Sequence, residues 1–140
     1  MKQIPVIFWT GTGNTQMMAD AVAEAINAVG AEAVVKNISE ITADEAAGYD
    51  ALALGCPAMG AEVLEECEFE PFFTELEGKL AGKKVALFGS YGWGGSYMQD
   101  WEARVKDAGA TLVADGVLAL GAPDDEAMAK LAEAGKLLAE

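Results

Sequence analysis

The segment Thr10-Gly11-Thr12-Gly13-Asn14-Thr15 constrains the fold more than any other stretch of this chain. A short apolar run over residues 4–9 precedes it, and apolar residues spaced three and four apart follow it over 17–29. Glycines allow a backbone to approach a ligand closely, and the amides at a helix N-terminus favour an anion. The order of strand, glycine- and hydroxyl-rich turn and helix is therefore typical of a phosphate-binding loop.

This segment contains no lysine or arginine. A Walker-type triphosphate site needs the lysine of its GKS or GKT sequence, so that kind of site is excluded. We expect the segment to hold one terminal monophosphate through backbone amides and the hydroxyl groups of Thr10, Thr12 and Thr15. The simpler alternative is a tight strand–helix turn in which Thr and Asn side chains cap the helix.

The composition narrows the classes of function. A chain of 140 residues is expected to form a single domain over 1–140. Its formal net charge of −14 argues against nucleic acid or an anionic membrane as a partner and favours a positively charged one. The chain has no histidine, the commonest general base, which makes a hydrolase or transferase less favoured but does not affect an electron carrier.

The N-terminus and the cysteines bear on location and redox state. No apolar run reaches the length of about 18 residues that spans a bilayer, and no signal peptide is evident, so we expect a cytoplasmic protein. The two cysteines, Cys56 and Cys67, do not make a disulfide scaffold or a zinc set. A buried, inert Cys56 is favoured over a redox thiol.

Apolar runs alternate with helical patterns along the chain, as in α/β domains. Strands are predicted over residues 3–9, 33–37, 50–55 and 84–89, with a fifth strand in two pieces, 111–113 and 117–120. Helices are predicted over residues 17–29, within 39–47, and over 71–80, 97–108 and 124–140. Right-handed crossovers favour a five-stranded parallel sheet of order 2-1-3-4-5 with helices on both faces. Its ligand site is expected outside the carboxyl ends of strands one and three.

In this topology the loops after strands one, three and four meet at one edge of the sheet. The loop after strand three contains Pro57, Ala58, Met59, Gly60, Ala61 and Glu62, and the loop after strand four contains Ser90, Tyr91, Gly92, Trp93, Gly94 and Gly95. Tyr91 and Trp93 stand among glycines, outside any amphipathic pattern. Flat side chains in such loops indicate stacking on a planar ligand. The alternative is that Met59 and Trp93 cover the end of the sheet as part of the core.

These three loops resemble the FMN-binding loops of the short-chain flavodoxins, especially those of anaerobic bacteria. Residues 83–94 and 68–72 match that family closely, and the similarity extends over nearly the whole chain. The resemblance implies an α/β, flavodoxin-like three-layer sandwich. It also implies a low-potential one-electron carrier with non-covalently bound FMN, which is not an enzyme. Such a protein would be a monomer that shuttles electrons between redox proteins with basic patches.

The resemblance also assigns roles by position. Residues 10–15 would hold the FMN phosphate, and Met59 and Trp93 would lie against opposite faces of the isoalloxazine ring. The Gly60 carbonyl would turn toward flavin N5 after the first electron, and Glu62 would accept a hydrogen bond from N3. Backbone amides near residues 92–94 would face N1 and O2. The chain departs from the usual family pattern at several positions, among them Tyr97, where tryptophan is frequent.

The chief alternative on the same fold is an NAD(P)H-dependent FMN or quinone reductase. Such an enzyme would need a second nucleotide site. The sequence contains no further glycine-rich strand–helix junction, and a chain of 140 residues has little room for one.

Overall fold

The computed structural model describes residues 2–9, 13–57, 64, 68–91 and 97–140. Its strands are β1 (Gln3–Phe8), β2 (Glu32–Asn37), β3 (Ala51–Gly55), β4 (Lys84–Tyr91), β5 (Thr111–Leu112) and β6 (Val117–Leu120). Its helices are α1 (Asn14–Ala28), the 3₁₀ turn η1 (Ile38–Glu40), α2 (Ala43–Ala46), α3 (Phe69–Glu77), α4 (Tyr97–Asp107) and α5 (Asp125–Ala139). The predicted alternation of strands and helices is confirmed.

All the strands are parallel, and the sheet order is β2-β1-β3-β4-β5, with β6 also paired to β4. The predicted order is therefore confirmed, with the fifth strand in two segments that pair with the beginning and the end of β4. Between them, the Gly116 amide donates to Glu102 Oε2 on α4 at 2.7 Å instead of to the ladder. A Cβ at Gly116 would lie 2.4 Å from Met98 Sδ, so a larger residue at this position would require the Met98 side chain to move.

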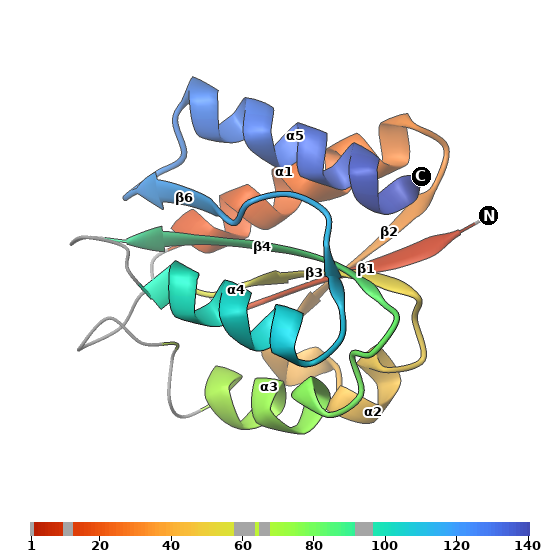
Figure 1. Cartoon of the computed structure of the whole chain (residues 1–140). Coiled ribbons are helices and arrows are strands. Elements are labelled where there is room, and N and C mark those ends of the chain that lie inside the picture. The colour runs from red at the N-terminus through yellow and green to blue at the C-terminus, as the bar shows by residue number, and fades with distance from the viewer. Residues whose placement is uncertain (1, 10–12, 58–63, 65–67, 92–96) are drawn as a thin grey trace.

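Each face of the sheet is covered by helices, which gives three layers (Figure 1). One core lies between the sheet and the helices α1 and α5, and includes Val6, Ala53 and Phe88 from the strands. The other core lies between the sheet and α2, α3 and α4, and includes Leu52 and Leu87. Successive strand residues therefore belong to opposite cores, as the pleat requires.

Several short sequence motifs adopt the local structures predicted for them. Thr42 and Glu45 make the predicted reciprocal capping box at the start of α2. Gly30 and Gly109 end α1 and α4 with φ of 91° and 88°, a backbone region that glycine tolerates. Pro5 lies within β1, where pairing with β3 begins only at Val6, so the ladder is incomplete beside the residue that lacks an amide hydrogen.

Among the element boundaries that differ from the sequence predictions, two lie next to the predicted site. α1 begins at Asn14, three residues before the predicted start, because its first turn is polar and carries no apolar periodicity. β4 continues through Ser90 and Tyr91, which were predicted to lie in a loop. These two residues pair with Ala119 and Leu120 of β6, so the partner strand extends β4.

Candidate functional site

The carboxyl ends of β1, β3, β4 and β6 lie at one edge of the sheet, opposite the two chain termini (Figure 1). Six of the predicted site residues are described there: Gly13, Asn14, Thr15, Pro57, Ser90 and Tyr91. The other predicted site residues lie outside the described residues: Thr10, Gly11, Thr12, Ala58, Met59, Gly60, Ala61, Glu62, Gly92, Trp93, Gly94 and Gly95. The roles predicted for all these residues in binding a ligand stay predictions.

The N-terminus of α1 faces this edge and has an unusual start. Its N-cap is Gly13, with φ of 95°, so the N-cap residue itself has no side chain that could cap the helix. The alternative of a turn capped by Thr or Asn is therefore wrong at the N-cap position. Each of the other helices described carries a carboxylate in its first turn, whereas α1 carries none. The positive end of the α1 dipole can therefore stabilise an anion that binds there from solution.

Two buried hydroxyl groups lie just behind this helix start. The side chains of Thr15 on α1 and Ser90 on β4 place their oxygens 3.4 Å apart, with the residues 1% and 7% exposed. They are the buried polar residues of the part of the chain that the structure describes. Each hydroxyl has one donor and two acceptor positions, so the long mutual contact leaves capacity for a further oxygen ligand.

A phosphate fits this arrangement. Its oxygens would accept hydrogen bonds from the backbone amides at the helix N-terminus and from the hydroxyl groups. Its negative charge would lie at the one described helix start that lacks a carboxylate of its own. Residues 13–15 of the predicted phosphate loop lie at this helix start, and residues 10–12 lie outside the described residues, so the phosphate site stays a prediction.

At the end of β3 the backbone remains hydrogen bonded for one residue beyond the strand. The Trp9 amide donates to the Gly55 carbonyl at 3.0 Å, and the Cys56 amide donates to the Phe88 carbonyl at 3.1 Å. Trp9 Nε1 also donates to Glu68 Oε1 at 3.2 Å, which links the end of β1 to the residue before α3. Cys56 is fully buried, as predicted, and its thiol donates to the Pro57 carbonyl at 3.4 Å.

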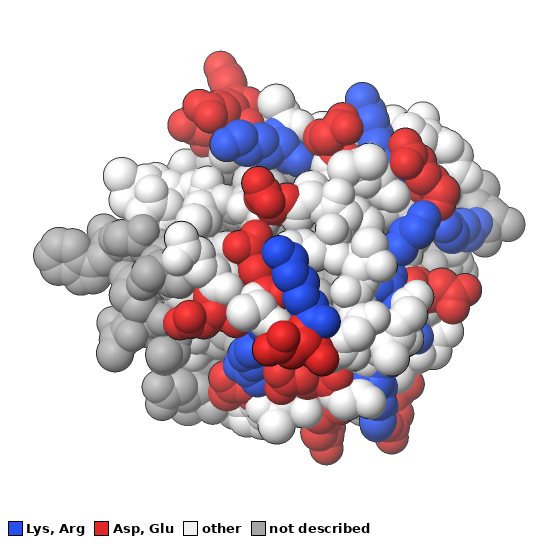
Figure 2. Space-filling model, in the orientation of Figure 1, with Lys and Arg blue, Asp and Glu red and all other residues white. Residues whose placement is uncertain are grey.

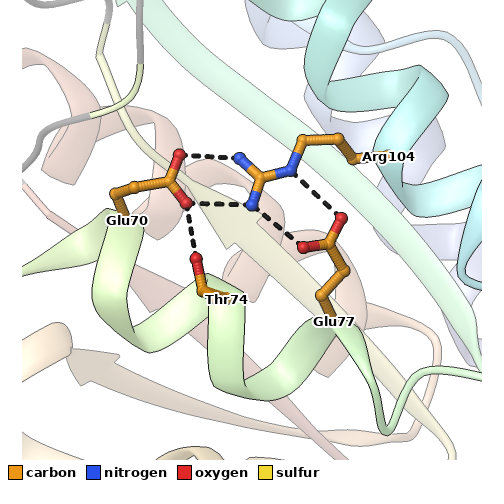
Figure 3. Close-up of polar contacts among 4 residues, drawn as sticks. All are labelled: Glu70, Thr74, Glu77 and Arg104. Atoms are coloured by element: carbon orange, nitrogen blue, oxygen red, sulfur yellow. Dashed lines mark hydrogen bonds and ion pairs between the residues drawn. The ribbon is translucent and has the colours of Figure 1, made fainter.

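A polar bridge joins α3 to α4 (Figure 3). The Arg104 guanidinium donates twice to Glu70, at 2.7 and 2.9 Å, and twice to Glu77, at 3.0 and 3.1 Å. It also lies over the Phe73 ring, with Cζ 4.7 Å from the centroid. Hydrogen bonds from Arg104 hold the pKa of Glu70 below its usual range. In the same way, the bonds to Glu70 and Glu77 raise the pKa of Arg104.

Sequence reasoning missed this bridge. The available signal was the spacing of Glu70 and Glu77, which are seven residues apart and therefore lie on one side of α3. It did not name the partner, because Arg104 is 27 residues from the nearer glutamate in the chain.

The charge of the chain is strongly negative. The chain has 23 Asp and Glu residues against 9 Lys and Arg residues. On the face shown in Figure 2, carboxylates and cations are interspersed. At the site edge, the helix starts add Glu70, Asp100, Asp125 and Glu126.

Two negative findings apply to the described residues. None of their helices is both long enough and apolar enough to cross a membrane. Nor do they include a cluster of three His, Cys, Asp or Glu side chains suited to a metal ion.

Comparison with known proteins gives a consistent picture. A family model described as flavodoxin matches residues 6–135. A flavodoxin of Clostridium beijerinckii is 47% identical over 135 residues, which cover 96% of this chain and 97% of that protein. A flavodoxin of Megasphaera elsdenii is 46% identical over 116 residues, covering 82% of this chain and 85% of the relative.

The fold agrees with a solved structure as well. The solution structure of two-electron reduced Megasphaera elsdenii flavodoxin has a TM-score of 0.87 and 43% sequence identity to this chain. The match covers 94% of this chain and 97% of that one.

Proposed function

The chain belongs to the flavodoxin family, and we propose that it binds FMN at the carboxyl edge of the sheet, with Thr15 and Ser90 beside the phosphate. Flavodoxins are FMN-binding electron-transfer proteins and not enzymes, so the reductase alternative is not favoured. When bound, FMN supplies a ring that accepts and releases electrons. The observation that carries the proposed site is the α1 start, which has a glycine N-cap and no carboxylate in its first turn, beside two buried hydroxyl groups.

The roles of the protein residues follow from this placement. The α1 amides and the Thr15 and Ser90 hydroxyls would hold the phosphate without a cation. The loops at residues 57–62 and 90–95 would contact the ring, as the sequence predicts. The bridge of Arg104 with Glu70 and Glu77 supports the helices that follow these two loops. No residue has to act as an acid or base, in agreement with a chain that lacks histidine.

Our proposal for the cellular role is a cytoplasmic, monomeric carrier of low potential. It exchanges electrons with other redox proteins, and we propose that these present basic patches. Supporting this choice of partner is the net charge of −14, together with the carboxylates at the helix starts around the site edge. The same negative charge opposes the addition of an electron to the bound cofactor, which supports a low potential.

The phosphate assignment is tested by comparing FMN with riboflavin, which lacks the phosphate. We expect calorimetry of the apoprotein to show much weaker riboflavin binding, because the amides and hydroxyls would lose their partner. In Thr15→Val the loss of one buried hydroxyl partner is expected to weaken FMN binding by about 1–3 kcal/mol, roughly 5- to 150-fold. Riboflavin binding should be unchanged in this variant.

Thr111→Val is the matched control, because it removes the same hydroxyl from an exposed position on β5. Its affinities for FMN and riboflavin should equal those of the wild type. Equal affinity of the wild type for both ligands would refute the phosphate site. A Thr15→Val variant that loses FMN and riboflavin affinity to the same extent would show that Thr15 supports the fold and not the phosphate.

A further inference from the structure

A buried hydrogen bond joins the first residue of α4 to the end of β3. The Tyr97 hydroxyl donates to the Cys56 carbonyl at 2.7 Å, and both residues are at most 2% exposed. The Tyr97 ring stacks on Trp101, with centroids 6.5 Å apart and an interplanar angle of 26°. Core packing therefore fixes where the hydroxyl lies.

Gly89 makes this contact sterically feasible. A Cβ at Gly89 would lie 2.1 Å from the Tyr97 hydroxyl and 2.1 Å from the Cys56 carbonyl oxygen. No real Cβ can occupy that position unless both of these atoms move. The tyrosine hydroxyl and the Cys56 carbonyl oxygen thus both pack directly against the β4 backbone at Gly89. Glycine is needed there because of this close approach.

The bonded carbonyl occupies a defined place in the chain. The Cys56 amide makes the bond to Phe88 that continues the β3–β4 ladder. The Cys56 carbonyl belongs to the peptide that leads into Pro57, the first residue of the predicted loop 57–62. Since proline has no amide hydrogen, this peptide can be held only through its carbonyl. Tyr97 is the described side chain that holds it.

From this geometry we propose that Tyr97 is a positioning residue for the FMN ring, because it fixes the Cys56–Pro57 peptide from which loop 57–62 departs. This inference rests on the proposed function. Preorganised binding segments lose less conformational entropy when the ligand binds. Without the hydroxyl, the base of the loop has more freedom, and ordering the loop against the ring becomes less favourable.

The effect should depend on the redox state of the cofactor. The family resemblance implies that the Gly60 carbonyl turns toward flavin N5 after the first electron. This contact would form only in the one-electron-reduced state. A less ordered loop base would therefore weaken FMN binding more in the reduced state than in the oxidised state. Loss of the Tyr97 hydroxyl should therefore make the first-electron midpoint potential more negative.

The experiment compares the wild type, Tyr97→Phe and Tyr49→Phe. Tyr49 precedes β3 at the opposite edge of the sheet, so its variant removes the same group far from the site. For Tyr97→Phe we expect oxidised FMN to bind about twofold to tenfold more weakly, the range for one neutral hydrogen bond. We expect a further threefold to tenfold loss in the one-electron-reduced state, or about 30–60 mV in the potential. Tyr49→Phe should match the wild type in both.

Gly89→Ala provides an independent route to the same result, because its Cβ must displace both the hydroxyl and the carbonyl and so break their hydrogen bond. It should shift the first-electron potential in the same direction. Urea unfolding of each apoprotein separates folding from positioning. A Tyr97→Phe variant that is less stable but has an unchanged potential would overturn the inference and make the bond purely structural. If the wild-type apoprotein binds no FMN, the proposed function itself fails.

Discussion

Replacement of Arg104 by methionine should lower the stability of the protein more than the loss of an ordinary surface cation. The side chain lies between α3 and α4, 29% exposed, with Glu70 and Glu77 at 35% and 31%. Each of its two ion pairs is partly screened by solvent, so we assign it about 0.5–1 kcal/mol. The contact with Phe73 adds about 0.5–1 kcal/mol. The sum is about 1.5–3 kcal/mol, or several degrees in Tm for a domain of this size.

The assay is urea unfolding of the apoprotein, followed by far-ultraviolet circular dichroism. Lys130→Met is the control, because Lys130 pairs only with Glu126 in the contacts described, and both side chains are more than 60% exposed. Each variant removes one cation, so the change in net charge is the same. Lys130→Met should cost less than about 0.5 kcal/mol. Arg104→Lys should recover only part of the loss, because one ammonium cannot reproduce the guanidinium fork.

The difference in stability between the wild type and Arg104→Met should depend on pH. Arg104 holds the pKa of Glu70 below its usual value. A lowered carboxyl pKa contributes stability that is present above the unfolded pKa, about 4.3, and is lost as the pH falls through the folded pKa. The difference in stability between wild type and Arg104→Met should therefore be constant from pH 7 to pH 5 and shrink below about pH 4.3. If Arg104→Met costs no more than Lys130→Met, the bridge contributes no more than an exposed pair.

Two further predictions concern a helix cap and the acidic surface. Asp124 accepts a hydrogen bond from the Ala127 amide at 2.8 Å, so Asp124→Ala should lower the free energy of unfolding of the apoprotein by about 1 kcal/mol in urea. Asp20→Ala, in the middle of α1, should not lower it, and equal losses would argue against the cap. In stopped-flow experiments, electron transfer to a positively charged redox protein should slow with added salt, since charges are screened over about 8 Å at physiological ionic strength. Rates that do not change with salt concentration would refute electrostatic steering.

The sheet could be predicted from the sequence because its signals are local. The apolar run Ala51–Leu54 predicted a strand buried on both faces, and its residues are divided between the two cores. Asp115-Gly116 predicted the interruption of the fifth strand. These features depend on the order of residues within a few positions, and the crossover rule then leaves few topologies.

Features that depend on distant partners could not be predicted in this way. β4 reaches Tyr91 because β6 pairs with it. The Arg104 bridge and the bond from Tyr97 to the Cys56 carbonyl join residues 27 to 41 positions apart. For the site, the sequence correctly brought Gly13, Thr15 and Ser90 to one edge. It did not show that Thr15 and Ser90 are buried beside each other, because that follows from the packing of α1 on β4.

The proposed phosphate site at the start of α1 offers a way for a strongly acidic protein to bind an anion. The partial positive charge at a helix N-terminus acts mainly within the first turn, so it stabilises a phosphate in contact with it and little else. A lysine in the same place would bind the phosphate too, but its full charge would also reach the surface. The surface field here comes from a net charge of −14, to which α3, α4 and α5 contribute carboxylates at their own first turns. Only α1 lacks a carboxylate in its first turn among the described helices. In the proposed function, this arrangement would separate the short-range attraction for the phosphate from the long-range attraction for a basic partner.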